Sequence, residues 1–249
     1  MQESIDYDYY QLSLREKIRC VGVSFLLAAL AAWLLYKNVG GMILVMVIFP
    51  IYRRNYRNEI ILDRKKRLLS QFKDAMQSVS VAILSGFSIE NAWVEGEKEL
   101  VELYGRNVDM VEEMRQINHG IRMNQSVEQL LFSFAERTHC DDIMEFAEVF
   151  RFAKRNGGNF GKIIQSTVLR IEERIEVERE IETIIAGKKM EQKIMNVIPI
   201  CLLAYLNITS EAFLAPMYGN LFGVCVMTII FFLYLAALRL AQKMVDIEV

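Results

Sequence analysis

The sequence contains little proline and histidine, and it lacks the motifs of common enzyme classes. It has 3 prolines and 2 histidines in 249 residues, and no proline falls between residues 53 and 193. Proline breaks helix interiors because it has no backbone donor, so this region can form long helices. The sequence contains no G-x-x-x-x-G-K-[ST] phosphate loop, no G-x-G-x-x-G turn and no G-x-S-x-G elbow. We therefore expect that the protein is not an enzyme and does not itself hydrolyse ATP.

The metal-binding residue types are sparse and poorly spaced. The 4 cysteines (Cys20, Cys140, Cys201 and Cys225) form no C-x-x-C pair, and we interpret them as small apolar packing residues. His139 begins the run His-Cys-Asp-Asp, but adjacent residues at a helix start do not face one point, so a helix cap explains them better. We expect no metal and no cofactor. The net charge of -2 gives no reason to expect a nucleic-acid partner.

Two uncharged apolar blocks lie towards the two ends of the chain. Only Lys37 interrupts the first, from Cys20 to Tyr52, and only Glu211 interrupts the second, from Ile194 to Leu238. A bilayer core of roughly 30 Å needs about 20 apolar residues in a helix. The blocks predict two membrane hairpins, residues 20–52 and 194–238, with four membrane segments. The second segment, residues 38–52, is short and is expected to end at Pro50, so it either borrows flanking residues or is partly re-entrant.

Basic residues predict the orientation of these segments. Membrane proteins place lysine and arginine in their cytoplasmic loops, and each segment here has basic residues on the side away from its short outer turn. The flanking residues are Arg15, Lys17 and Arg19; Arg53, Arg54, Arg57 and residues 64–67; Lys188, Lys189 and Lys193; and Arg239 and Lys243. We therefore expect both tails, residues 1–19 and 239–249, and the central region, residues 53–193, to be cytoplasmic. The acidic, aromatic start of the chain does not resemble a cleavable signal, so we expect a retained anchor.

The central region has helical periodicity. Apolar residues recur at spacings of three, four and seven in six successive stretches, which is typical of helices with one buried face. The predicted inner faces include Ile61, Leu68, Phe72, Ala75, Val79 and Ile83; Ile89, Ala92, Trp93, Leu100 and Leu103; Val111, Met114 and Ile117; Leu130, Leu131 and Phe134; Ile143, Phe146, Ala147, Phe150 and Ala153; and Ile164, Val168, Ile171, Ile175 and Ile185. The expected fold is all-α: a cytoplasmic antiparallel bundle of about six helices flanked by two transmembrane helical hairpins.

Turn and cap signals divide the first five helices. We expect stops at Gly86, at Gly120 and at Gly157-Gly158, where glycine permits the left-handed C-terminal conformation. Ser88 and Ser126 are predicted N-caps, the latter in a capping box with Gln129, and Asp141 is the predicted cap of the fifth helix. The sixth helix has no strong stop before residue 194, which leaves its continuity with the third membrane segment open.

Four segments resemble one protein family. Residues 83–92, ILSGFSIENA, resemble the L-x-x-G-x-S-x-x-x-A turn of the type II secretion system F-domain family, and residues 146–160, FAEVFRFAKRNGGNF, resemble its second signature. Gly120 followed by residues 126–130, SVEQL, is similar to the turn between them. Residues 213–219, FLAPMYG, resemble the outer loop of tight-adherence (Flp) pilus platform proteins, which also have one cytoplasmic bundle. Phe160 stands where the family usually has leucine.

The resemblance implies a role in the bacterial cytoplasmic (inner) membrane. Such multi-pass platform proteins are thought to link a cytoplasmic hexameric ATPase to pilin-like subunits, and to form homo- or hetero-oligomers with a sister platform subunit. The leading hypothesis is therefore a platform of a tight-adherence pilus or a related secretion system. The alternatives are a platform of a competence or type II-like secretion pseudopilus and, from another class, a small membrane transporter. The few charges within the membrane blocks argue against ion-coupled transport.

The candidate site residues are structural positions and contact surfaces. Gly86, Ser88, Gly120, Gly157 and Gly158 are interpreted as structural positions of the family motifs. The basic residues Arg53, Arg54 and Arg57 serve as a topological anchor, bind anionic lipid or dock an acidic partner. The glutamates Glu172, Glu173 and Glu176 form either a solvated face or a partner contact. Asn196, Asn207 and Pro199 indicate helix packing and a kink, or else a groove that faces pilin.

Overall fold

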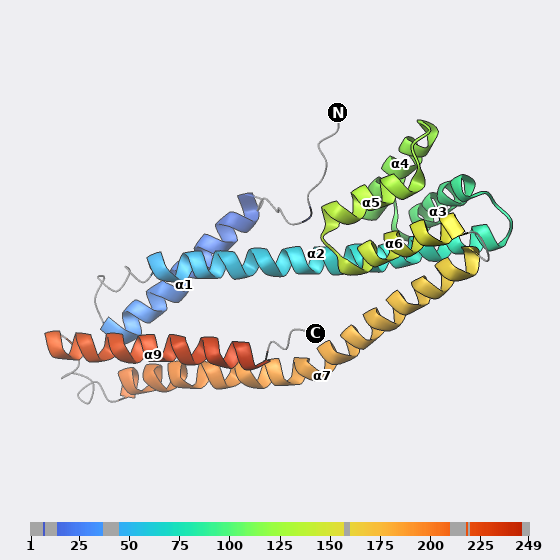
Figure 1. Ribbon diagram of the computed structural model, residues 1–249. Coiled ribbons are helices and arrows are strands. Elements are labelled where there is room, and N and C mark those ends of the chain that lie inside the picture. The colour runs from blue at the N-terminus through green and yellow to red at the C-terminus, as the bar shows by residue number, and fades with distance from the viewer. Residues whose placement is uncertain are drawn as a thin grey trace. The chain divides into compact units, whose positions relative to one another are not determined.

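The computed structural model describes Tyr7 and residues 14–36, 45–156, 160–209, 218 and 220–245. All regular structure in these residues is α-helical, as predicted, and they contain no strand. The helices are α1 (Leu14–Tyr36), α2 (Val45–Leu84), α3 (Ile89–Tyr104), α4 (Asp109–Arg122), α5 (Val127–Thr138), α6 (Asp141–Asn156), α7 (Phe160–Thr209) and α9 (Leu221–Val245) (Figure 1).

The chain divides into two compact units. The first, which we call the core unit, comprises residues 1–11 and 57–177. The second, which we call the apolar unit, comprises residues 12–56 and 178–249. Both α2 and α7 contribute residues to each unit. The boundary between the units falls between residues 56 and 57 in α2 and between residues 177 and 178 in α7.

Aromatic side chains from four helices fill the centre of the core unit. The ring of Phe72 on α2 meets that of Phe146 on α6 edge-on, with centroids 5.1 Å apart, and Phe150 contacts Phe160 on α7 at 5.2 Å. Trp93 on α3 lies 6.3 Å from Phe150 and is fully buried. In sequence order, α3 packs on α4, α4 on α5 and α5 on α6. Most of the residues predicted for the inner faces are buried. Ile61, Ile83, Ile89, Leu130, Ile175 and Ile185 are only partly buried, and all of these except Ile61 and Ile185 pack against the core. The prediction for Leu103 was wrong, because in the last turn of α3 its side chain is 66% exposed.

Local signals correctly predicted several helix boundaries. After α2 ends at Leu84, Gly86 has φ +94°, a conformation that favours glycine. The hydroxyl of Ser88 accepts a hydrogen bond from the backbone N–H of Asn91 at 3.3 Å. The hydroxyl of Ser126 accepts one from Gln129 N–H at 3.4 Å. Both serines therefore cap their helices by satisfying otherwise unpaired N–H groups.

Two predicted boundary residues were wrong. Gly120 does not end its helix, since α4 continues to Arg122 and the left-handed turn falls on Asn124 (φ 61°). Gly120 instead allows close packing, because a Cβ there would lie 2.5 Å from a methyl group of Leu130. Asp141 is the first residue of α6 rather than its cap; the carbonyl of Cys140 accepts the first helical hydrogen bond, from Met144. Asp141 still suits this position, because an acidic side chain in the first turn opposes the helix dipole.

Pro50 does not end a helix either. It is the sixth residue of α2, which continues for 34 more residues to Leu84. So close to the N-terminus, proline removes one of the first intrahelical hydrogen bonds and leaves the rest of the helix intact. The expected boundary between the second membrane segment and the central region thus falls inside α2. The predicted stop at Gly157 and Gly158 and the outer turns at Lys37 and Glu211 lie outside the described residues.

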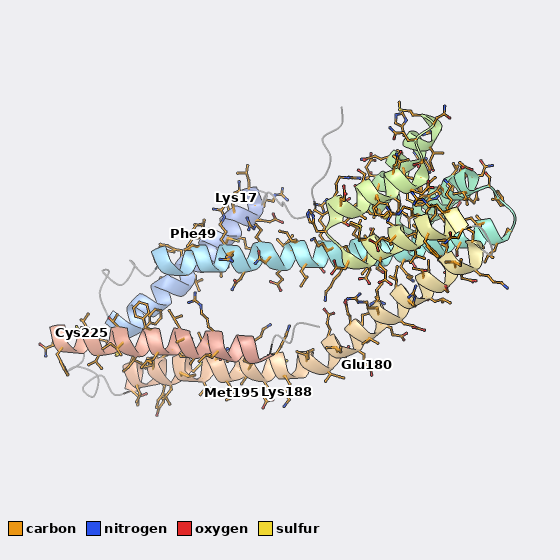
Figure 2. All side chains as sticks on the ribbon, viewed as in Figure 1. Lys17, Phe49, Glu180, Lys188, Met195 and Cys225 are labelled. Atoms are coloured by element: carbon orange, nitrogen blue, oxygen red, sulfur yellow. The ribbon has the colours of Figure 1, made fainter. Side chains whose placement is uncertain are left out.

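The apolar unit holds membrane-length apolar sequence. Among the described residues, two helices are long and apolar enough to cross a bilayer, α7 and the part of α9 from Phe222 to Ala241. Within this unit α1 contacts α9, and Tyr234 on α9 donates a hydrogen bond to the carbonyl of Asn196 on α7. Met195 and Cys225, labelled in Figure 2, are both exposed. Other large apolar side chains exposed here are Ile194, Ile198, Leu202, Tyr205, Ile208, Phe222, Ile229 and Leu233.

The open question about the sixth predicted helix is answered by α7. It is one helix from Phe160 to Thr209, with Pro199 inside it. Asn207 is nearly buried and hydrogen-bonds the hydroxyl of Tyr218 at 3.0 Å and the carbonyl of Leu203 at 3.3 Å. These polar groups are paired within the apolar unit, which is the arrangement expected of helix packing.

Candidate interaction sites

The predicted acidic contact residues lie on the outer side of α7. Glu172, Glu173 and Glu176, which we call the acidic ridge, are all exposed. Glu172 accepts an ion pair from Lys73 of α2 at 3.3 Å, and its side chain is still half exposed. For Glu173 and Glu176 no ion pair is found within the described residues, so their carboxylates face solvent and are available to a cationic partner.

The acidic ridge is held in place by the packing of α7 on α6. One turn of α7 buries Val168 and Ile171 in the core. On the flank of the helix, Arg174 pairs with Asp142 at 2.8 Å and Arg170 reaches Glu145 at 3.7 Å. The structure therefore presents the ridge on a fixed helix rather than on a loop.

The predicted basic contact residues are all on α2. Arg53, Arg54 and Arg57 are exposed, the first two in the apolar unit and the third in the core unit. No ion pair of these three side chains is found in the part of the chain that the structure describes. Exposed guanidinium groups next to an apolar segment suit anionic lipid headgroups, each contributing about 1 kcal/mol near a charged bilayer surface.

A buried ion pair that we did not predict lies between α4 and α5. Glu113 on α4 has no exposed surface, and Arg137 on α5 binds it with two hydrogen bonds of 2.9 and 2.6 Å. Tyr7, far away in the sequence, donates its hydroxyl to the same carboxylate at 2.9 Å. Glu113 is thus satisfied by three charge-assisted or hydroxyl hydrogen bonds, which a buried carboxylate needs.

A second ion pair encloses the other side of Tyr7. Arg64 on α2 makes a bidentate pair with Asp109 on α4, at 2.7 and 3.0 Å. Its guanidinium carbon lies 4.9 Å from the centroid of the Tyr7 ring, a cation–π distance. Burial raises the pKa of the Tyr7 hydroxyl far above its ordinary value, and the carboxylates of Glu113 and Asp109 raise it further against the opposing charge of Arg64. The hydroxyl is therefore a permanent donor at physiological pH.

Of the residues in these two ion pairs and Tyr7, only Glu113 has a position in the sequence that points to its buried role. Glu113 lies on the buried face of α4, which includes Met110, Met114 and Ile117 and the polar side chain of Asn118. A charge on a buried face indicates a paired partner elsewhere, but it does not say which. Tyr7 and Glu113 are 106 positions apart, so no local pattern connects them.

A shallow hollow on α6 is lined by Glu148, Val149, Arg151, Phe152 and Arg155, all from one helix. Among the described residues, no three His, Cys, Asp or Glu side chains gather as metal ligands. Searches of protein-family models, curated proteins and solved structures found no match for this chain.

Proposed function

We propose that this chain is a membrane platform subunit of a bacterial tight-adherence (Flp) pilus or a related secretion system, of the type II secretion F-domain kind. In this proposal residues 53–193 form a cytoplasmic antiparallel bundle, and residues 20–52 and 194–238 form two hairpins in the cytoplasmic membrane. The basic flanks of the apolar blocks support this orientation, because they would all lie on the cytoplasmic side. The four motif segments support the family.

The continuity of α7 is the observation that carries the proposal. The same helix buries Ile164, Val168 and Ile171 in the core unit and contains a membrane-length apolar stretch further on. A platform has to pass motion from a cytoplasmic motor to membrane segments. A helix without an intervening loop supplies one direct connection for this purpose, and α2 supplies a second.

The partners follow from the chemistry of the two surfaces. The acidic ridge would contact a basic face of the cytoplasmic secretion ATPase or of a sister platform subunit. Arg53, Arg54 and Arg57 would bind anionic lipid headgroups at the membrane surface. Pilin-like subunits would meet the exposed apolar side chains of the apolar unit. The chain itself would bind no nucleotide, consistent with its missing phosphate loop.

The test is deletion of the gene in its host, followed by complementation. We expect loss of surface filaments in electron micrographs while the ATPase and pilin are still produced, and recovery with the wild-type chain. Loss of DNA uptake or of secreted proteins without loss of filaments would instead favour a competence or type II-like system. If all of these are unaffected and the purified chain moves a solute into lipid vesicles, the platform proposal is wrong and the transporter is favoured.

Charge reversal tests the acidic ridge separately. Changing Glu172, Glu173 and Glu176 together to lysine should abolish complementation without lowering the amount of protein in the membrane. The matched control changes Glu99 and Glu102, exposed glutamates of α3, to lysine. Equal complementation by the two variants would remove the ridge from the proposal and leave the platform role in place.

A further inference from the structure

The outer surface of α6 presents an exposed aromatic ring between two arginines. Phe152 is 66% exposed, and Arg151 and Arg155 line the same shallow hollow. We call these three residues the basic face. Within the described residues neither arginine forms an ion pair, and Glu148, which also lines the hollow, forms none with them. The basic face therefore combines positive charge that has no carboxylate partner with apolar surface that is open to water.

Packing within the core unit restrains the basic face. The guanidinium carbon of Arg151 lies 4.5 Å from the centroid of the Phe132 ring on α5, a cation–π distance. Phe132 itself packs against the core. A guanidinium on a ring face still donates hydrogen bonds from its edge, in the planar fork that matches a carboxylate. Arg151 therefore loses less side-chain freedom on binding a carboxylate than an arginine without such a contact.

The acidic ridge on α7 has the complementary composition. Beside its carboxylates, the side chains of Leu169 and Val177 are 46% and 52% exposed. Leu169, Glu173 and Val177 follow one another at intervals of four residues, so they lie on one side of the helix. The ridge thus offers apolar side chains flanked by carboxylates, as the basic face offers an apolar ring flanked by guanidinium groups. Joining the two surfaces would pair opposite charges and remove exposed apolar atoms from water.

The two surfaces cannot meet within one copy of the chain, although both belong to the core unit. The pairs of Arg174 with Asp142 and of Arg170 with Glu145 show that α6 and α7 run antiparallel, with the acidic ridge beside the first turn of α6. Arg151 and Arg155 follow Asp142 by 9 and 13 positions. At 1.5 Å per residue this is about 14 and 20 Å along the helix, further than an arginine side chain reaches. Only another copy can bring a ridge to the basic face.

We propose that the basic face of α6 is a docking surface for the acidic ridge of a second copy of this chain. Each copy carries both surfaces, so the contact can be made twice in a two-fold dimer or repeated around a closed ring. The exposed glutamates of α3, Glu99 and Glu102, fit the basic face less well, because Lys98 lies beside them. Self-association would also multiply any surface that binds the ATPase, so a ridge variant should lose ATPase by lost avidity as well. This inference does not depend on the platform function.

The test measures association between two full-length copies that carry different tags. The copies are co-expressed and crosslinked in membranes, one tag is captured in mild detergent, and the co-purified amount of the other tag is measured. The basic-face variant is Arg151→Glu with Arg155→Glu, and the ridge variant changes Glu172, Glu173 and Glu176 to lysine. Phe152→Asp is a second variant of the basic face, which leaves the contact of Arg151 with Phe132 in place. The matched controls reverse other exposed charges: Arg106→Glu with Arg122→Glu, and Glu99→Lys with Glu102→Lys.

We expect two wild-type copies to co-purify. Two basic-face variants, or two ridge variants, should co-purify about tenfold less, because like charges then face each other across the contact. A basic-face variant paired with a ridge variant should return to within about twofold of wild type, because the unchanged ridge of the first meets the unchanged basic face of the second. Phe152→Asp should also lower co-purification, and both controls should match the wild type.

Recovery in the mixed pair separates a shared interface from general damage to the fold, and the fluorescence of buried Trp93 verifies that each variant is folded. Three results would overturn the proposal: wild-type copies that do not co-purify even after crosslinking, charge-reversed variants that co-purify as well as wild type, or a mixed pair that does not recover. The readout needs no ATPase, pilin or filament, so a failure of the platform role would leave it unchanged.

Discussion

Arg137 should be among the most sensitive positions of the core unit, because it neutralises a carboxylate with no exposed surface. We consider Arg137→Met, which keeps an apolar stem and removes the charge and both hydrogen bonds to Glu113. Removing one partner of a buried ion pair costs about 3–5 kcal/mol, since the other charge stays buried without its partner. A domain's total stability is about 5–15 kcal/mol, so this substitution should remove a large part of it.

Thermal unfolding of the full-length chain in detergent measures this loss. The protein has 2 tryptophans, and Trp33→Phe leaves Trp93, buried in the core unit, as the single reporter. At about 4 °C per kcal/mol for a unit of this size, Arg137→Met should lower the melting temperature by roughly 12–20 °C. The control is Arg115→Met: Arg115 pairs with Glu112 at 2.6 Å, but both side chains are more than a third exposed. Such a pair contributes less than about 1 kcal/mol.

The double variant Glu113→Leu with Arg137→Met distinguishes two costs: the loss of the attraction between the two charges, and the burial of Glu113 without a partner. Replacing both partners with apolar residues is often close to neutral, and Tyr7 would lose one hydrogen bond, about 1 kcal/mol. The double variant should therefore regain most of the lost melting temperature. The reasoning is refuted if Arg137→Met shifts the melting temperature no more than Arg115→Met, or if the double variant is less stable than the single one.

Three further predictions use the same fluorescence assay. Gly120→Ala should destabilise the fold by about 1–3 kcal/mol through overpacking. Gly187→Ala, with open space around the added Cβ, should be neutral or stabilise the fold by up to about 1 kcal/mol. Equal effects of the two substitutions would contradict the close packing at Gly120. Ser88→Ala should cost about 1 kcal/mol as a lost cap, and a shift that aspartate at that position cannot rescue would argue against capping. Burial raises the pKa of Glu128, but the hydrogen bond from Lys154 at 2.8 Å, a backbone hydrogen bond and the charges of Lys154 and Arg155 together lower it by more. This pair therefore stabilises the fold at pH values above the ordinary carboxyl pKa, and its contribution is lost as the pH falls through the lower pKa of Glu128 in the folded state. Glu128→Gln should then destabilise the fold at pH 7 and much less below about pH 4. A loss of stability that persists in acid would contradict this assignment.

Short-range signals in the sequence were sufficient for much of the fold. The inner faces follow from helical spacing, and the caps at Ser88 and Ser126 follow from side chains that reach only three residues along the chain. Such features depend on local geometry, which the sequence encodes directly. Gly120 shows where this fails. Its motif position suggested a helix end, but its role is set by Leu130 on the neighbouring helix, which only the packed structure reveals.

The candidate interaction sites also differ in whether local sequence patterns could predict them. The exposure of the acidic ridge and of the arginines on α2 was within reach of the sequence, because charged residues on a helix face opposite its apolar stripe are usually solvated. The Tyr7 site could not be predicted from the sequence. Its four partners come from three helices, and a charge on a buried helix face, such as that of Glu113, can indicate only that some partner is needed. Pairing over a separation of 106 residues depends on how the helices pack, which local patterns do not determine.

The proposed role of this chain, as a platform between a cytoplasmic ATPase and pilin-like subunits, can be tested by recovering its partners. The tagged chain is purified from native membranes in mild detergent, with and without crosslinking, and the bound proteins are identified by mass spectrometry. We expect a hexameric secretion ATPase and a pilin-like protein, and we expect the ATPase to be depleted in membranes from cells that carry the lysine-substituted acidic ridge. A clean preparation that lacks both partners in several detergents and after crosslinking would contradict it.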